Sequence, residues 1–231
     1  MRLGIISDIH SNLPAFKSVL SDIRKNDVDY VLCLGDVVGY GASPNRVIEI
    51  LERSPLKKIA VRGNHDEAVV TGDLMKLDRN ASEAAHWTIE NIRNENLRFL
   101  ENLEKHQAVE IDGQKFFLVH GSPRDPLNEY VKKGVPNETL DEFFEDTGAD
   151  VLLMGHTHIP FHRSTKGGLV LNPGSVGQPR DRDRRASYAL LDTRENKREI
   201  RRISYNIEKA IQEIKKTGIP ERVAYRLNYG Q

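Results

Sequence analysis

Side chains able to bind metal ions stand at five places in the sequence, each directly after a short apolar run. Residues 7–10 are Ser-Asp-Ile-His, residues 63–66 are Gly-Asn-His-Asp and residues 155–158 are Gly-His-Thr-His. Two further runs are followed by Gly35-Asp36 and by His120-Gly121. Imidazole, carboxylate and amide oxygen, with no thiolate among them, form a ligand set that suits borderline first-row divalent ions such as Mn, Fe, Co, Ni and Zn.

These five segments contain seven candidate metal ligands: Asp8, His10, Asp36, Asn64, His120, His156 and His158. Seven ligands are too many for one four-coordinate ion and suit two metal ions that share a bridging ligand. Two such ions can bind both non-bridging oxygens of a phosphoryl group, and they can lower the pKa of a bridging water from about 15.7 toward about 7. The pattern therefore predicts a hydrolytic centre.

The spacing inside the segments also matters. Asp8 and His10 are separated by one residue, as are His156 and His158. If these segments are extended, alternate side chains point the same way, so both members of each pair can face one centre. A glycine directly precedes three of the candidate ligands, which suits a backbone that turns sharply at a strand end and approaches a bound group closely.

The apolar runs that precede these side chains have the length of β-strands and are mostly continuous, as expected for strands covered on both faces. The runs are residues 3–6, 30–34, 59–61, 116–119, 151–154, 169–171 and 188–191. Helical patterns follow Asn12 and Ser43-Pro44, which are typical helix starts. This alternation predicts parallel strands joined by right-handed crossovers. Because ligands bind at the carboxyl ends of strands in open α/β sheets, we expect the polar side chains to converge there.

The second part of the sequence predicts antiparallel pairing, so we expect a mixed sheet. Asp112-Gly113, between residues 108–111 and 115–119, is typical of a tight hairpin turn. Residues 187–192 and 197–205 form a second predicted pair around residues 193–196.

Two regions outside the predicted strands have helical patterns. Residues 80–104 carry apolar positions at helical spacing, which predicts an insertion packed on the core. Apolar residues between 207 and 214 step at i, i+3, i+4 and i+7 and predict an amphipathic helix, whereas no periodic pattern follows Pro220. We therefore predict one domain over residues 1–205, with a C-terminal helix and tail, residues 206–231, packed on it.

Composition narrows the classes of partner. The 231 residues carry formal net charge +0, so no global field would attract a nucleic-acid polymer or an anionic membrane. No apolar run approaches the roughly 18 residues of a membrane helix. The apolar stretch near the first residue is also too short for a secretory signal. The single Cys33 excludes an internal disulfide and suits a reducing compartment. A cytoplasmic protein without a membrane partner is expected.

The polar segments, in this order, resemble the signature motifs of the calcineurin-like metallophosphoesterases. The matching residues are Asp8-x-His10, Gly35-Asp36 with the later Gly39, Gly63-Asn64-His65-Asp66, His120-Gly121 and Gly155-His156-Thr157-His158. The resemblance covers roughly residues 1–205 and is greatest to the small bacterial and archaeal phosphodiesterase-like members. It implies an α/β fold with mixed sheets, built as a four-layer αββα sandwich with the metal site at the carboxyl ends of strands.

The resemblance also implies a role for each residue. One metal ion would be held by Asp8, His10, Asp36 and His158. The other would be held by Asp36, Asn64, His120 and His156, with Asp36 as the bridge. His65 would point toward substrate and protonate the leaving oxygen or stabilise the transition state, and Asp66 would orient His65.

The remaining polar residues have structural interpretations, and one of them is also a candidate for substrate binding. Single histidines are usually structural, which is the interpretation favoured for His86, His106 and His162. A turn-rich segment, residues 172–180, resembles a loop near the site in related family members and ends in Arg180, a candidate substrate-binding residue. Structural turns and solvated charges are the alternative for this loop and for the arginines after it.

The sequence predicts a metal-dependent phosphoesterase, specifically a phosphodiesterase, that acts on a small phosphate ester with two divalent metal ions. Manganese is the ion favoured for activity. The alternatives are a phosphomonoesterase, a protein phosphatase or a dinucleoside-polyphosphate hydrolase. A further alternative, of another class, is a catalytically silent binding scaffold with the same fold.

Overall fold

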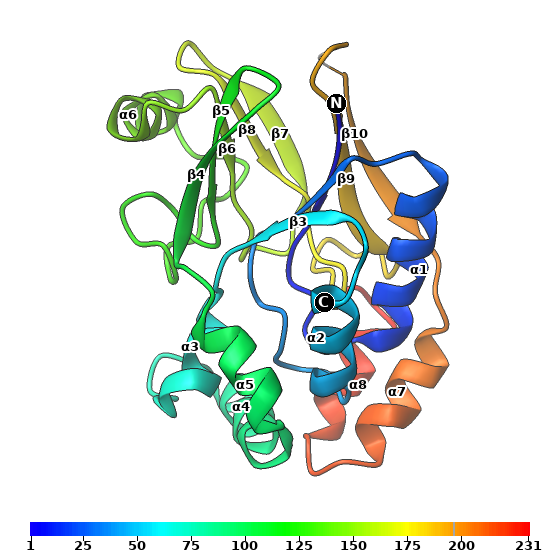
Figure 1. Cartoon of the computed structure of the whole chain (residues 1–231). Helices are drawn as coiled ribbons and strands as arrows, with labels where there is room; N and C mark the ends of the chain where they lie inside the picture. The colour runs from blue at the N-terminus through cyan, green and yellow to red at the C-terminus, as the bar shows by residue number, and fades with distance from the viewer. Residues whose placement is uncertain (196) are drawn as a thin grey trace.

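The computed structural model describes residues 1–195 and 197–231, and within these residues two five-stranded sheets lie face to face (Figure 1). The strand order is β10-β9-β1-β2-β3 in the first sheet and β4-β5-β6-β8-β7 in the second. The predicted turn at residues 193–196 includes Asn196, which lies outside the described residues. Each half of the chain builds a mixed sheet of its own, which confirms the predicted α/β fold with mixed sheets.

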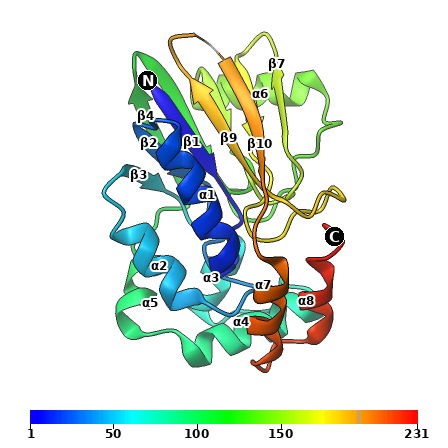
Figure 2. The same cartoon turned by 90° about the vertical axis from the view of Figure 1, so that its right-hand side faces the viewer.

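The first sheet follows the predicted alternation of strands and helices. Strands β1 (Arg2–Ile6), β2 (Tyr30–Cys33) and β3 (Lys57–Ala60) are parallel. Helices α1 (Leu13–Lys25) and α2 (Pro44–Glu52) connect them and cover the outer face (Figure 2). The antiparallel pair β9 (Ala186–Asp192) and β10 (Lys197–Ile203) completes the sheet on the other side of β1.

The second sheet contains a parallel centre with antiparallel edges. Its strands are β4 (His106–Ile111), β5 (Gln114–Val119), β6 (Val151–Leu153), β7 (Phe161–Ser164) and β8 (Leu169–Asn172). Strands β5, β6 and β8 are parallel, whereas β4 and β7 are antiparallel to their neighbours. Helix α6 (Asn137–Thr147) precedes β6 and lies on the outer face (Figure 1). Neither α6 nor β7 was predicted from the sequence.

The layers α6, second sheet, first sheet and α1 with α2 make the predicted αββα sandwich. Residues of β1 pack against different layers: Leu3 and Ile5 lie between the two sheets, whereas Ile6 packs toward the helices. In β2, Leu32 faces the other sheet and Cys33 faces the helices. Burial of both faces explains why these strands are continuously apolar.

The remaining helices gather at one end of the molecule, as Figures 1 and 2 both show. Helices α4 (Arg79–Asn91) and α5 (Asn94–Glu101) account for the predicted helical insertion. Helix α7 (Ile207–Lys215) matches the predicted amphipathic helix, and α8 (Glu221–Arg226) follows it without having been predicted. Side chains of α4, α7 and α8 share an apolar cluster. Among the described residues, no helix has the length and apolar character needed to span a bilayer.

Candidate metal centre

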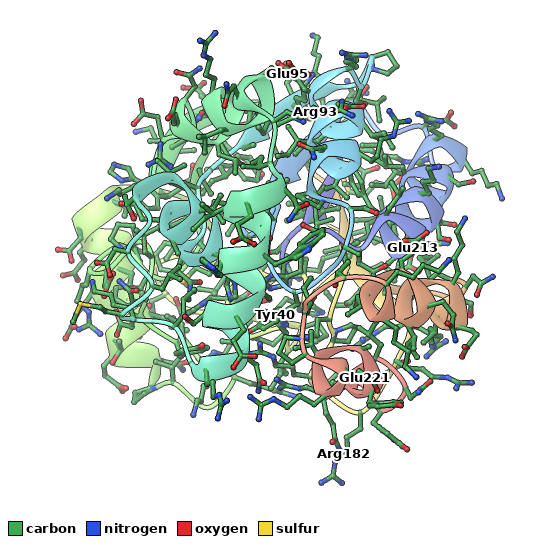
Figure 3. All side chains as sticks on the ribbon, turned by 90° about the horizontal axis from the view of Figure 1, so that it is seen from below. Tyr40, Arg93, Glu95, Arg182, Glu213 and Glu221 are labelled. Carbon is green, nitrogen blue, oxygen red and sulfur yellow. The ribbon has the colours of Figure 1, made fainter. Side chains whose placement is uncertain are left out.

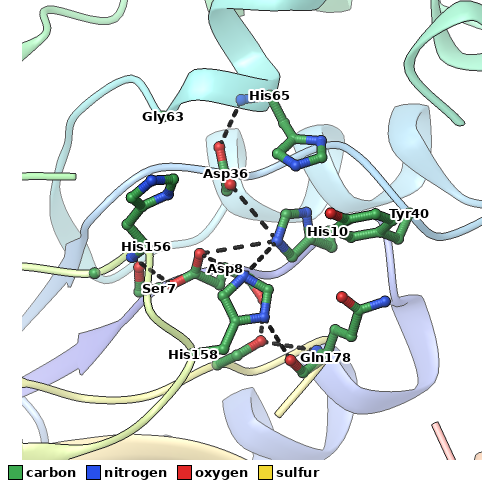
Figure 4. Close-up of polar contacts among 12 residues, drawn as sticks. Ser7, Asp8, His10, Asp36, Tyr40, Gly63, His65, His156, His158 and Gln178 are labelled. Atoms are coloured by element: carbon green, nitrogen blue, oxygen red, sulfur yellow. Dashed lines mark hydrogen bonds and ion pairs between the residues drawn. The ribbon is translucent and has the colours of Figure 1, made fainter. Parts of the chain in front are cut away.

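Four of the predicted ligands meet at the carboxyl ends of β1, β2 and β6. The Nε2 atom of His158 lies 3.1 Å from Oδ1 of Asp8 and 3.0 Å from Nε2 of His10. His10 Nε2 lies 3.5 Å from Oδ2 of Asp36. All four side chains are buried, and one ligand atom from each lies within 4.8 Å of the others. Figure 4 shows these groups turned toward one another.

A second group lies on the other side of Asp36. Its Oδ2 atom is 3.3 Å from Nε2 of His120, which in turn lies 3.1 Å from both Nδ1 of His156 and Oδ1 of Asn64. The backbone N–H of His65 donates to Asp36 Oδ1 at 2.9 Å, which turns Oδ2 toward both groups. The structure thus brings all seven predicted ligands together, with Asp36 shared.

These separations suit donor atoms arranged around an ion. Ligand atoms bonded at about 2.0 to 2.2 Å to one ion are separated from each other by roughly 3 to 3.5 Å. Asp8 Oδ1 is buried and accepts no backbone hydrogen bond among the described residues; its polar neighbours are the Nε2 atoms of His158 at 3.1 Å and His10 at 3.8 Å, which are themselves candidate metal ligands. An unpaired buried carboxylate oxygen is costly unless a cation satisfies it, so the donor set fits the divalent metal ions that the sequence predicted.

Each candidate imidazole has one nitrogen beside a backbone carbonyl. The Nδ1 atoms of His10, His120 and His158 lie 3.2, 2.7 and 2.5 Å from the carbonyl oxygens of Val38, Leu34 and Gln178, and Nε2 of His156 lies 3.2 Å from that of Asn128. If each of these nitrogens carries the proton, the opposite nitrogen presents its lone pair to the centre. This is the arrangement that orients histidine ligands in metalloproteins.

In the metal-free centre the charged groups shift one another's pKa values strongly. Burial tends to raise the pKa of Asp36, but His120 and His65 outweigh it and hold this pKa well below its usual range. Burial lowers the pKa of His156 to about 3. Burial also lowers the pKa of His120, but the charge of Asp36 outweighs burial and raises this pKa to about 9. A cluster with this much mutual dependence is typical of a functional site.

The backbone at the ligands is left-handed rather than extended. Positive φ angles occur at Asp8 (54°), His10 (47°), His156 (65°) and His158 (59°). Asp8 and His10 belong to the same ligand group, whereas His156 and His158 belong to different groups. The proposed reason for their orientation, alternation along an extended segment, was wrong. Left-handed conformations of residues other than glycine are strained and concentrate at functional sites.

Glycines allow the strand ends to approach each other. A Cβ atom at Gly63 would lie 2.1 Å from Oδ1 of Asp36, and one at Gly155 would lie 2.1 Å from Oγ of Ser7. Gly35 has a φ of +87° and would bring a Cβ within 2.6 Å of the backbone of Gly63. The predicted need for close approach therefore holds, and only Gly35 of these three requires a positive φ.

His65 differs from the four candidate histidine ligands. Its ring centroid lies 4.7 Å from those of both His10 and Tyr40, and its buried Nδ1 has no hydrogen-bond partner within the part of the chain described (Figure 4). Burial lowers its pKa to about 4, with Asp36 opposing and Arg180 reinforcing the shift. His65 is therefore neutral at pH 7 in the metal-free protein.

Asp66 was predicted to orient His65. Among the described residues, however, no hydrogen bond joins their side chains. Its Oδ1 accepts a hydrogen bond from the N–H of Val38 and its Oδ2 accepts one from Gly63, each at 3.0 Å. Burial raises the pKa of Asp66 to about 7, and Asp36 adds to the effect. Asp66 instead ties the start of helix α3 (Asn64–Thr71) to the segment after Asp36.

Arg180 lies beside the centre together with an aromatic residue that the sequence did not single out. Its Nη2 donates to the hydroxyl of Tyr40 and to Oε1 of Gln178, both at 3.1 Å. Burial raises the pKa of Tyr40 to about 12, so its hydroxyl stays protonated. Viewed from the helical end, Tyr40 lies between α4 and the C-terminal helices (Figure 3). Its contacts depend on tertiary packing, so no local pattern marks it.

A second unpredicted aromatic, Tyr130, stacks on His156 with a centroid distance of 3.8 Å. Nearby, a cavity of about 200 Å³ is lined by residues that include Asn64, Lys76 and Asn128. This cavity provides space beside the second group of ligands. The histidines interpreted as structural lie elsewhere: His86 pairs with Glu90, for example.

Comparisons with known proteins agree with this geometry. Residues 1–196 match a family model described as the calcineurin-like phosphoesterase superfamily domain. The uncharacterized protein MJ0912 of Methanocaldococcus jannaschii is 38% identical over 99% of this chain and 98% of its own length. Phosphodiesterase YfcE of Escherichia coli K12 is 32% identical over 83% of this chain and 88% of its own. A crystal structure of a metallophosphoesterase from Sphaerobacter thermophilus is 34% identical, with a TM-score of 0.85 over 100% of this chain and 99% of that one.

Proposed function

Because the chain belongs to the calcineurin-like phosphoesterase superfamily, we propose that it is a dinuclear-metal-dependent phosphodiesterase acting on a small phosphate ester. The observation that carries this proposal is the pair of ligand groups that share Oδ2 of Asp36. The relative named phosphodiesterase supports the preference for diesters. Manganese is our favoured ion for activity, within a donor set that suits several first-row metals.

In this proposal the two ligand groups divide the metal ions between them. Asp8, His10 and His158 would hold one ion and Asn64, His120 and His156 the other, and Asp36 would contribute to both. When bound, such ions neutralise charge that develops on the phosphoryl oxygens and make a water molecule acidic enough to act as nucleophile. The backbone carbonyls behind the imidazoles keep each ring in the tautomer that can bind.

His65 is the proposed catalytic residue of the chain itself. It stands next to both ligand groups, yet it is not held by a carbonyl as the ligand imidazoles are. An imidazole at this place can donate an N–H hydrogen bond to the oxygen that leaves phosphorus. It can transfer a proton to that oxygen only from its protonated form, which the negative charge of a bound phosphate ester favours. Arg180 is proposed to contact a substrate oxygen, since its Nε is buried without a partner among the described residues.

The proposed compartment is the cytoplasm. The thiol of Cys33 is free and buried, and burial raises its pKa to about 12, so it serves packing rather than catalysis. A chain whose one cysteine is unpaired suits a reducing environment. The neutral net charge supports a small substrate over a nucleic-acid polymer.

The test is hydrolysis of bis(p-nitrophenyl) phosphate and of p-nitrophenyl phosphate by protein loaded with Mn²⁺. We expect faster turnover of the diester and loss of activity with EDTA, restored by adding Mn²⁺ in excess. Asp36→Asn should abolish turnover, whereas Asp27→Asn, at an exposed position, should not. Absence of turnover with every divalent ion, despite bound metal, would favour the binding-scaffold alternative.

A further inference from the structure

The C-terminal helices extend the chain beyond the matched family domain and reach the metal centre. The family model ends at residue 196, before α7 and α8 begin. Val223 and Leu227 line a small cavity whose wall also includes His10 and Tyr40. The C-terminal segment is therefore part of the wall of the site in this protein.

The end of the chain is attached to the loop that carries Arg180. The N–H of Arg182 donates to the carbonyl of Gly230 at 2.9 Å, and a Cβ atom on Gly230 would lie 2.9 Å from the backbone of Asp183. Arg226 Nε donates to the main-chain oxygen of Gln231 at 2.9 Å. These contacts hold the half-buried side chain of Arg226 next to this loop.

The contacts between the chain end and the Arg180 loop place the charge of Arg226 on the same side of the centre as that of Arg180. Burial lowers the pKa of Arg226, and the charge of Arg180 lowers it further. Within the described residues, neither guanidinium forms an ion pair with an Asp or Glu side chain. Asp78 acts on Arg226 through its charge, but its carboxylate accepts hydrogen bonds from the N–H groups of Asn80 and Ala81 at the start of α4.

Donors around these charges are left without partners. Arg180 Nε and Gln178 Nε2 are buried with no hydrogen-bond partner in the described chain, and Gln178 is only 1% exposed. Adjacent like charges and unpaired buried donors are unfavourable by themselves, and a bound anion would satisfy both.

We propose that Arg180 and Arg226 bind a second phosphoryl group of the substrate, so that the substrate is a phosphodiester that also carries a phosphate monoester. This inference rests on the proposed function, because it assumes that the metal groups face the diester. A diester has a single negative charge, whereas a phosphate monoester has about −1.5 to −2 at pH 7 and three acceptor oxygens. Two guanidinium groups match that charge, and their nitrogens that are not bonded to Tyr40, Gln178 or Gln231 can donate to the phosphate oxygens.

The kinetic test uses two chromogenic substrates that differ by one phosphate: the p-nitrophenyl ester of thymidine 5′-phosphate and its 3′-phosphorylated counterpart. With Mn²⁺, the wild type should have a kcat/KM at least about tenfold higher for the 3′-phosphorylated ester, the effect of one hydrogen bond between charged groups. Arg226→Met should bring this ratio close to one, and Arg226→Lys should retain most of it. Equal values for both esters in the wild type would overturn the proposal.

Two matched variants test the location. Arg222→Met removes an exposed arginine from the same helix, and Lys76→Met removes a cation from the cavity on the other flank of the centre. Both should keep the preference for the 3′-phosphorylated ester. If Lys76→Met loses the preference and Arg226→Met keeps it, the second phosphate binds in that cavity and the proposed site is wrong.

A binding measurement separates this inference from the proposed function. In calorimetric titrations of Mn²⁺-loaded protein, thymidine 3′,5′-bisphosphate should bind at least about tenfold more tightly than thymidine 5′-phosphate, and Arg226→Met should remove the difference. Failure to hydrolyse either chromogenic ester would contradict the proposed hydrolase while leaving this comparison valid. Equal affinities of the two nucleotides for the wild type would overturn the phosphate site alone.

Discussion

The ring of Tyr130 stacks on the imidazole of His156, with centroids 3.8 Å apart and planes inclined by 25°. The Nε2 atom of His156 lies 3.2 Å from the carbonyl oxygen of Asn128, which precedes Tyr130 by two residues in the same loop. One loop therefore fixes both the plane and the direction of this imidazole. Since Tyr130 is 52% exposed, the ring contributes through this contact rather than through burial in the core.

Replacing Tyr130 with Ala should weaken metal binding at the second group by about tenfold, because partners that orient a ligand typically contribute a factor of 10 to 100 in affinity. Tyr130→Phe keeps the stacked ring and should bind metal as the wild type does. Calorimetric titration of the metal-free protein with Mn²⁺ would measure both variants. Equal affinity for Tyr130→Ala and the wild type would show that the stack does not support the ligand.

Replacing His65 with Ala should lower kcat for a phosphodiester by about 10²- to 10⁴-fold, the usual contribution of a general acid. Metal content should not change, because His65 belongs to neither ligand group. Metal analysis and steady-state kinetics on the same preparation would test this, with the exposed His86→Ala as control. Turnover equal to the wild type on a substrate with a poor leaving group would refute the role.

The convergence of the ligands could be predicted because each one ends a recognisable strand. Continuous apolar residues mark β1, β2, β5 and β6, and parallel strands bring their carboxyl ends to one edge. The edge strand β7 was missed because it has four residues, with only Phe161 buried. Helix α6 does carry Leu140, Phe143 and Phe144 at helical spacing, so the sequence contained a signal for it.

Contacts between distant segments could not be predicted in this way. Asp66 accepts a hydrogen bond from the N–H of Gly63, three residues earlier, which is the spacing of a capping box although the residue types are not the usual ones. In contrast, Tyr130 lies on His156 through a loop, and Val223 lies beside His10 through a short helix, and neither segment has a motif of its own. Their relation to the ligands depends on how the two sheets and the C-terminal helices pack.

Gly63→Ala should abolish tight metal binding and lower the stability of the fold. The new Cβ atom would lie 2.1 Å from Oδ1 and 2.3 Å from the backbone nitrogen of Asp36, so both the shared carboxylate and the main chain beside it would have to move. The φ of Gly63, −97°, is one that alanine adopts, so the effect comes from these contacts. Gly134→Ala is the matched control, because a Cβ there meets no atom within 4 Å. Mn²⁺ affinity and circular dichroism would be compared, and wild-type affinity in Gly63→Ala would contradict the steric argument.

Asp22 connects helix α1 to the antiparallel pair at the edge of the first sheet. Its Oδ2 accepts hydrogen bonds from the hydroxyl of Tyr188 at 2.6 Å and from Nε of Arg201 at 2.8 Å. Burial by itself would raise the pKa of Asp22, but these hydrogen bonds outweigh burial and lower it below 3.8. The ionised carboxylate is therefore favoured by the folded state.

The lowered pKa fixes how stability should depend on pH. At pH values above about 3.8, where the carboxylate is ionised even in the unfolded chain, its contribution is fully present, and it is lost as pH falls through the folded-state pKa. Asp22→Asn should therefore lower the free energy of unfolding by about 1 kcal/mol at pH 7 and at pH 5, with the difference shrinking below pH 4 as the wild type loses its advantage. Urea unfolding of metal-free protein, with Asp27→Asn as control, would measure it. A difference that grows on acidification would mean that the carboxylate is not stabilised by Tyr188 and Arg201.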